Sequence, residues 1–130
     1  EGAVALAQSP YLGRLKYLRL NNNNISDEGV AALAQSGTLV RIEELYLEHD
    51  NWIHAQGARA IAESQAFSNM KVLVLGMNLI GDEGAFFIAE SKNLSQLEFL
   101  NVIGNKLTAA GEDALQFSPN LGKLRTLELV

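Results

Sequence analysis

The chain has 130 residues, of which 48% are hydrophobic and 19% are charged, a composition typical of one folded globular domain. Fifteen acidic residues against ten Lys and Arg residues give a net charge of −5, which disfavours nucleic acid and acidic membrane surfaces as partners, because both bind basic faces. The absence of cysteine excludes disulfides, thiolate metal sites and cysteine nucleophiles.

The strongest pattern in the sequence is an internal repeat of 27 to 28 residues, which indicates a repetitive fold. The segment LKYLRLNNNNISDEG begins at Leu15, related segments begin at Ile42, Met70 and Leu97, and a partial copy begins at Leu124. The predicted full repeats are residues 15–41, 42–69, 70–96 and 97–123, with a helix half-repeat over 1–14 and a final strand over 124–130.

Each repeat is predicted to hold one short strand followed by one helix. The L-x-L spacing, which places Leu18 and Leu20 on one face in the first repeat, is typical of a strand. Alanine and other apolar residues then recur at helical spacing after a glycine, and Ser26 and Thr108 are predicted to cap the helices that they precede. Strands one period apart must run parallel, with the helices stacked on one side of the sheet, so the expected fold class is α/β.

The string L-x-x-L-x-L-x-x-N-x-I, followed by G-x-x-x-L, resembles the leucine-rich repeat in its ribonuclease-inhibitor-like form over the whole chain. This resemblance implies a right-handed α/β horseshoe solenoid, with parallel strands on the concave side and helices on the convex side. The phrases DEG-x-x-A-L-A-x-S and S-P-x-L-x-x-L resemble repeats of bacterial proteins of unassigned role, so a bacterial source is expected.

Residues 1–130 are expected to form a single domain that is a fragment of a longer array. A solenoid needs polar terminal repeats, and the repeat positions at both ends are as apolar as those inside. Uncapped ends would also allow end-to-end self-association.

An asparagine follows the strand in most repeats, at Asn23, Asn78 and Asn105. These residues resemble the buried asparagine ladder of leucine-rich repeats, whose amides bond to the backbone of neighbouring turns. An insertion in the second repeat leaves either Asp50 or Asn51 in this position, and Asn51 is preferred because an amide both donates and accepts. The serines that follow each helix are predicted to close turns.

The same insertion produces the only local group of potential metal ligands, which comprises Glu48, His49, Asp50, Asn51, Trp52 and His54. Consecutive residues of a turn point in different directions, and the other repeats lack these residues, so no metal site and no cofactor is predicted. Trp52 has two interpretations, since it either covers the edge of the sheet or anchors a partner.

Strand residues that point away from the helices are predicted to form the concave, partner-binding surface. With the adjoining loop residues, the candidates are Tyr17, Arg19, Tyr46, Glu48, Trp52, Val72, Val74, Met77, Phe99, Asn101 and Ile103. The apolar members of the third and fourth repeats are expected to form one exposed patch, and such patches usually mark contact sites. The alternative is that these residues reflect strand propensity alone.

A column of alternating charge precedes the strands, formed by Lys16, Glu43, Lys71, Glu98 and Arg125. A slip of one repeat would place like charges side by side, so this column is interpreted as a device that fixes the register.

No nucleophile-elbow, P-loop, zinc-protease or dinucleotide-binding motif is present, so a non-enzymatic protein-interaction scaffold is predicted. Its partner is expected to be a protein bound at the concave strand face, with neither nucleic acid nor membrane involved. The alternatives are a substrate-presenting repeat region of a larger bacterial effector or enzyme, and a purely structural spacer. The compartment is left open, with a cytoplasmic location favoured over that of a secreted effector.

Overall fold

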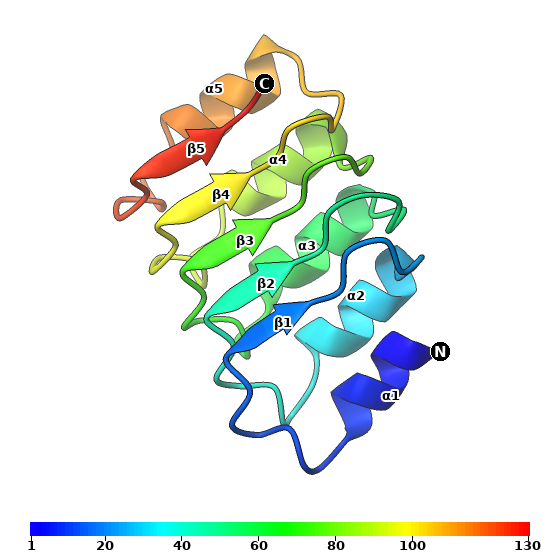
Figure 1. Ribbon diagram of the computed structural model, residues 1–130. Coiled ribbons are helices and arrows are strands. Elements are labelled where there is room, and N and C mark those ends of the chain that lie inside the picture. The colour runs from blue at the N-terminus through cyan, green and yellow to red at the C-terminus, as the bar shows by residue number, and fades with distance from the viewer.

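The computed structural model describes residues 1–130, in which five helices alternate with five strands (Figure 1). The elements in chain order are α1 (Gly2–Gln8), β1 (Tyr17–Arg19), α2 (Ser26–Ala34), β2 (Glu44–Tyr46), α3 (Ala55–Glu63), β3 (Val72–Val74), α4 (Gly81–Ala89), β4 (Phe99–Asn101), α5 (Ala109–Gln116) and β5 (Thr126–Glu128). None of the helices is long and apolar enough to cross a membrane.

The five strands form one parallel sheet in the order β1-β2-β3-β4-β5. The register places one leucine of each repeat directly opposite the next, at Leu18, Leu45, Leu73, Leu100 and Leu127. The helices stack in the same order on one side of the sheet (Figure 1). Parallel strands lie about 4.8 Å apart whereas packed helices need about 8–10 Å, so the array curves with its strands on the inner side. The predicted α/β solenoid is therefore confirmed.

One core runs through all the repeats as a single cluster of 27 buried residues between sheet and helices. Leu45, Leu73 and Leu100 are fully buried, whereas Leu18 in the first strand keeps 8% of its surface exposed. Complete burial of such a side chain stabilises the fold by roughly 1.5–3 kcal/mol. Each repeat therefore depends on its neighbours to exclude water from its apolar face.

Glycines let consecutive helices approach closely. A Cβ placed on Gly84 of α4 would lie 2.7 Å from Ile80 Cβ and 3.2 Å from Ala58 Cβ of α3. Gly29 is enclosed in the same way by Ile25 and by Ala3 of α1. A larger residue at this column would push neighbouring helices apart.

The predicted asparagine ladder is present and buried at Asn51, Asn78 and Asn105, but the prediction is wrong for Asn23, which is exposed. The Asn23 side chain donates only to the Asn21 carbonyl in its own turn, and its backbone N–H instead donates to Asn51 Oδ1 (3.0 Å). The Asn78 side-chain amide donates to the carbonyls of Leu47 (2.8 Å) and Leu75 (3.0 Å), and its oxygen accepts from the Ile53 N–H (3.2 Å). Asn105 and Asn51 repeat this pattern one strand away on either side. Asn51 is completely buried and Asp50 is exposed, which confirms Asn51 as the ladder residue of the second repeat.

The serines close turns and also join neighbouring repeats. The Ser64 hydroxyl donates to the Ala34 carbonyl at the end of α2 (2.6 Å) and accepts from the Phe67 N–H in its own turn (3.3 Å). The hydroxyl of Ser36 makes the equivalent bond to Ala7 of α1 at 2.7 Å. These bonds satisfy helix carbonyls that would otherwise lack partners.

The prediction of helix caps is correct for Thr108 and wrong for Ser26. The Thr108 hydroxyl accepts from the Ala110 N–H (3.3 Å), whereas Ser26 adopts a left-handed backbone (φ 63°) and its side chain caps nothing. Ser26 instead donates its backbone N–H to the Asn51 carbonyl in the next repeat (2.7 Å). Ser26 does not cap α2 because its left-handed backbone is held by this hydrogen bond to the neighbouring turn.

Candidate functional site

The concave face is built by the first and third residues of each strand. Alternation along the strand directs the middle leucine into the core and leaves its two neighbours on the inner curve. Tyr17 is the most open of these side chains, with 61% of its surface exposed, and Tyr46, Val72 and Phe99 are half-buried. The candidate side chains therefore lie on consecutive rungs of one ladder.

The first two strands hold a fixed aromatic group. The Arg19 guanidinium carbon lies 4.3 Å from the centre of the Tyr46 ring, in cation–π geometry. The Tyr46 hydroxyl donates to Glu44 Oε1 at 2.6 Å, and this bond to a carboxylate raises the pKa of Tyr46. Contacts on both the ring face and the hydroxyl hold Tyr46 in one orientation.

Val72 and Phe99 lie opposite each other on β3 and β4 and form the apolar centre of the concave face. Val74 does not belong to the accessible patch, because it keeps only 3% of its surface exposed, so its predicted exposure is wrong. Its neighbours in register are Tyr46 and Asn101, whose longer side chains enclose the short valine.

The fourth strand ends in a polar link to the fifth. The Asn101 amide donates to Glu128 Oε2 (2.9 Å), and its oxygen accepts from the Ile103 N–H (2.9 Å). Ile103 is half-buried at the end of this link. Asn101 thereby holds its loop against β5, and both its amide nitrogen and its oxygen already bond within the chain.

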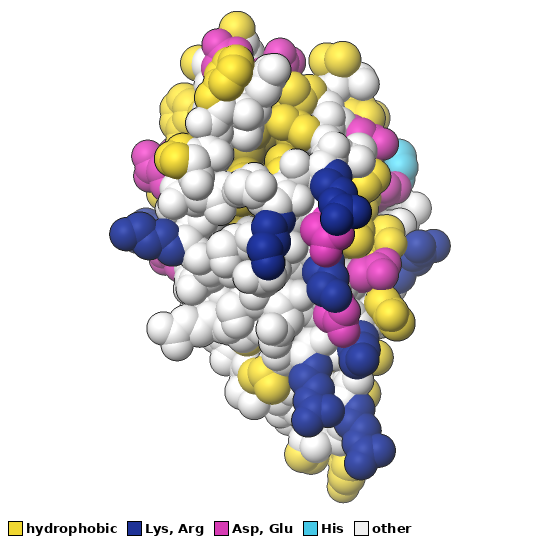
Figure 2. Space-filling model, turned by 90° about the vertical axis from the view of Figure 1, so that its left-hand side faces the viewer, with side chains coloured by type: hydrophobic (Ala, Val, Ile, Leu, Met, Phe, Trp, Pro, Cys, Tyr) yellow, Lys and Arg dark blue, Asp and Glu magenta, His cyan; other side chains and the backbone are white.

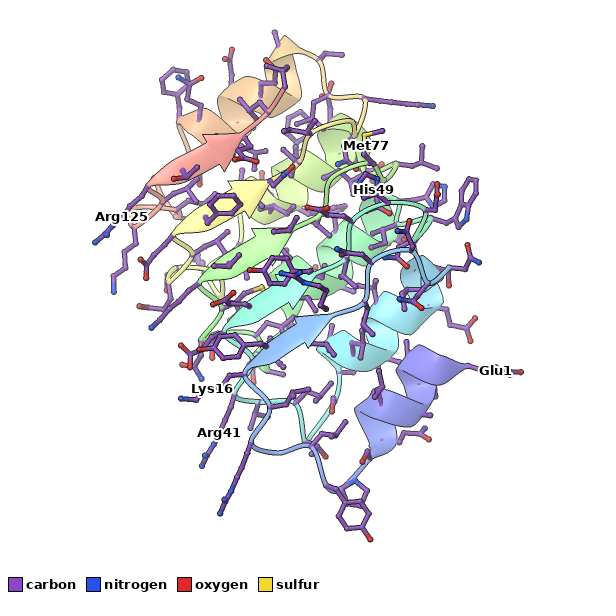
Figure 3. All side chains as sticks on the ribbon, viewed as in Figure 1. Glu1, Lys16, Arg41, His49, Met77 and Arg125 are labelled. Atoms are coloured by element: carbon purple, nitrogen blue, oxygen red, sulfur yellow. The ribbon has the colours of Figure 1, made fainter.

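Met77 forms the rim at the carboxyl end of the strands, close to His49 (Figure 3). Its backbone is left-handed (φ 57°) and 52% of its surface is exposed. The equivalent residues Asn22, His49 and Gly104 are also left-handed, so this turn requires a positive φ in every repeat. A Cβ on Gly104 would clash with the Met77 sulfur, so the glycine makes room for the methionine. An exposed thioether is thus held in a conformation that is unfavourable for an unbranched apolar residue.

Trp52 lies in the inserted loop and is fixed by a neighbouring repeat. Its indole N–H donates to Asn24 Oδ1 (3.0 Å), its φ is 54°, and 54% of its surface remains exposed. Asn24 was not among the predicted site residues, although the run Asn21–Asn24 consists of asparagine, a residue type that tolerates a left-handed turn. The bond orients the ring and leaves one face open to contact.

Each histidine of the inserted loop lies close to one carboxylate. His49 Nε2 lies 3.5 Å from Glu48 Oε2, and His54 Nδ1 lies 3.6 Å from Asp27 Oδ2 in the preceding repeat. No three histidine, aspartate or glutamate side chains converge in a set that could hold a metal ion. Glu48 itself is half-buried beside the concave face.

Three comparisons with known proteins bear on this arrangement. A family model described as "Leucine Rich repeat" matches residues 15–34 and 68–89, which are the strand-to-helix halves of the first and third repeats. The solved structure of actin-binding site 2 of leiomodin-1 has a TM-score of 0.81 at 15% identity, over 99% of this chain and 78% of that one. The C-terminal domain of tropomodulin from Caenorhabditis elegans has a TM-score of 0.75 at 15% identity, over 99% of this chain and 81% of that one.

The chain has the leucine-rich-repeat fold. Identity of 15% to the solved structures establishes a shared fold and does not transfer a binding partner. No protein of curated function matches the chain in sequence.

Proposed function

We propose that this leucine-rich-repeat chain is a protein-interaction scaffold that binds a protein partner through its concave face. The observation that carries the proposal is the set of aromatic and apolar side chains on the inner curve and its rim, namely Tyr17, Tyr46, Val72, Phe99 and Met77. Tyrosine, phenylalanine, methionine and arginine are enriched at protein interfaces. Arg19 on β1 and Trp52 in the loop after β2 add side chains of the same kind in the first two repeats.

Preorganisation supports the proposal, because a side chain that is already immobilised loses little entropy on binding. Tyr46 is held through Arg19 and Glu44, and Trp52 is held through Asn24. The solved leiomodin-1 structure with the same fold is an actin-binding site, which supports a protein as the kind of partner. We assign a binding role rather than a catalytic one to the chain.

Three finer predictions belong to this proposal. The single helix in each repeat supports the ribonuclease-inhibitor-like subtype, and a bacterial source stays a prediction. A substrate-presenting region of a larger effector would use the same concave face, so it differs from the main proposal only in what the rest of the protein does. A structural spacer would leave that face without a ligand.

The test compares three immobilised baits in quantitative pull-downs from a lysate of the source organism. One bait is the natural chain, the second carries Val72→Lys, Phe99→Glu and Trp52→Ala, and the third carries the matched changes Val40→Lys, Phe86→Glu and Phe117→Ala. Val40, Phe86 and Phe117 are exposed outside the concave face, with Phe86 on α4, Phe117 just after α5 and Val40 in the turn between α2 and β2.

We expect the natural and matched baits to retain the same proteins, and the concave variant to retain at least about ten-fold less, since central interface residues commonly contribute more than 1 kcal/mol each. Circular dichroism of all three baits shows whether each is folded. Equal recovery on the natural and concave-variant baits, with both folded, would refute the assignment and favour the spacer.

A further inference from the structure

The charges of this acidic chain are divided between two opposite edges of the sheet. Seven of the ten Lys and Arg residues lie in the turns that lead from a helix end to the next strand: Arg14, Lys16, Arg41, Lys71, Lys92, Lys123 and Arg125. We call this surface the basic edge. Figure 2 looks onto it and shows Lys and Arg side chains gathered there. Figure 3 places Lys16, Arg41 and Arg125 on this side and His49 and Met77 on the opposite one.

The opposite edge is acidic. The first turns of α2, α4 and α5 begin there and contain Asp27, Glu28, Asp82, Glu83 and Glu112. Because all strands run parallel, every repeat contributes its basic turn to the same edge. The separation therefore adds up along the array instead of cancelling, although the net charge is −5.

The alternating column occupies consecutive rungs of the basic edge. The backbone N–H of Glu43 donates to the Lys16 carbonyl (2.8 Å), that of Lys71 to Glu43 (2.7 Å), that of Glu98 to Lys71 (2.8 Å) and that of Arg125 to Glu98 (2.8 Å). Glu43 lies between two lysines, 3.6 Å from Lys16 Nζ and 3.3 Å from Lys71 Nζ. The hydrogen bond to Lys71 is the main reason that the pKa of Glu43 is lowered. Basic and acidic side chains can be followed in alternation along this row in Figure 2.

A polar hollow of about 370 Å³ adjoins this row, and no hydrophobic residue lines it. Its lining residues are Lys16, Arg41, Glu43, Asn69, Lys71 and Gln96. Arg41 forms no ion pair in the structure and is exposed, so its planar guanidinium is free to receive a carboxylate in bidentate geometry. The hollow therefore has more positive than negative charge and carries an open anion receptor.

We propose that the basic edge binds an extended, acidic segment of a partner protein, with a carboxylate at about every third residue. In the alternating row, a basic residue recurs on every second strand. At the usual strand spacing, successive basic residues are about 9.6 Å apart, and three residues of an extended chain span about 10 Å. Such a segment places its carboxylates at Lys16, Lys71 and Arg125 and has neutral residues beside Glu43 and Glu98. The unpaired Arg41 shares the polar hollow with Lys16 and Lys71, so it binds the carboxylates placed there. This surface is separate from the concave centre, so the proposal goes beyond the proposed function.

A protein segment fits this edge better than a nucleic acid does. Each strand of a nucleic-acid duplex carries a phosphate for about every 3.4 Å of the helix axis, so some of the phosphates would fall beside Glu43 and Glu98. The net charge of −5 also repels a polyanion at longer range. A peptide can leave uncharged residues where the edge itself is negative.

The test uses fluorescence anisotropy at low salt with two labelled peptides of identical composition. One peptide repeats Asp-Ser-Gly, and the other groups all its aspartates in one block. We expect the spaced peptide to bind the natural chain several-fold more tightly, and added salt to weaken its binding, since exposed charges are screened. Equal affinity for the two peptides would overturn the proposal.

Matched variants locate the binding site. Arg41→Gln should weaken binding of the spaced peptide by up to about five-fold, the range of one exposed ion pair. Lys106→Gln changes the net charge equally at the opposite edge and should have no effect. Equal weakening by both variants would show unspecific attraction, and tighter binding of single-stranded DNA or phosphatidylserine vesicles than of the spaced peptide would overturn the choice of partner.

Discussion

Buried asparagines provide hydrogen-bond partners for the backbone in the turns that follow β2, β3 and β4. The turn that leaves the sheet has carbonyls and N–H groups that no strand or helix can pair, and burial without partners is unfavourable for both. The primary amide of Asn78 donates to one carbonyl of the preceding repeat and to two of its own turn, and it accepts from one N–H of the preceding repeat. Aspartate cannot donate when ionised, which explains why Asn51 and not Asp50 occupies the buried position.

Asn78→Ala should therefore lower the free energy of unfolding by about 1–3 kcal/mol, because buried backbone groups lose their partners. Urea unfolding followed by circular dichroism measures the change. Asn23→Ala is the control, since Asn23 is exposed and its side chain donates only to the Asn21 carbonyl. An Asn78→Ala midpoint equal to that of the natural chain would contradict the role assigned to the ladder.

At the scale of the elements, strands and helices are too short to be stable alone. Each strand has three residues and no helix exceeds nine, and isolated helices of fewer than about 12 residues are marginal in water. Consecutive helices compensate by capping one another. Asp27 of α2 accepts from the N–H groups of His54 (2.7 Å) and Gly57 (3.1 Å) at the start of α3. Asp82 of α4 accepts from the N–H (2.8 Å) and the hydroxyl of Thr108 at the start of α5.

These caps alternate along the array. Only α2 and α4 have an Asp-Glu pair in the first three residues, and each caps the following helix, whose first three residues are neutral. Gly57 and Gly111 leave room for the two carboxylates, because a Cβ at either glycine would overlap an aspartate oxygen. The effective structural unit for capping is therefore a pair of repeats.

The cap at Asp82 predicts a pH dependence. Hydrogen bonds from Thr108 lower the pKa of Asp82 below its usual 3.8, so the ionised form stabilises the folded state above that pH. Asp82→Ala should be less stable than the natural chain at neutral pH, and the difference should shrink as pH falls below 3.8 through the folded-state pKa. Urea midpoints measured across this range test the effect.

Asp113→Ala provides the control for charge, since Asp113 is exposed on α5. It should leave the midpoint nearly unchanged throughout the pH range. A constant difference between Asp82→Ala and the natural chain, down to strongly acidic pH, would rule out the ionised carboxylate as the cap.

The whole molecule behaves as a stack in which no slice has a core of its own. The buried cluster extends from Ala3 to Leu121, and the asparagine, serine and aspartate bonds all cross between repeats. Interfaces between repeats therefore contribute a large part of the stability, and in such arrays strong interfaces make unfolding cooperative.

The position of the single tryptophan allows a test of this cooperativity. Trp52 lies in the second repeat and reports local unfolding by fluorescence, while circular dichroism reports all five helices. Urea transitions followed by the two signals should coincide. Separate midpoints would show that the repeats unfold independently and that the interfaces are weak.

Much of this architecture can be predicted from the sequence, because every repeat must bury the same apolar positions and pair the same backbone groups. The 27 to 28 residue period predicts parallel strands, the leucine register, and the asparagine and serine positions, and these are confirmed except at Asn23, which is exposed. The candidate surface was also predictable as a face, since alternation along a strand assigns each side chain to one side.

Features that depend on the side chains of a neighbouring repeat needed the three-dimensional arrangement. The burial of Val74 follows from the particular residues beside it, Tyr46 and Asn101. The bond between Trp52 and Asn24 joins groups 28 positions apart, and the cap of α5 comes from Asp82, 26 positions before Thr108. A periodic pattern predicts which positions lie side by side, but it does not predict which side chains of neighbouring repeats come into contact. In a stacked array, these contacts decide which surfaces stay exposed to a partner.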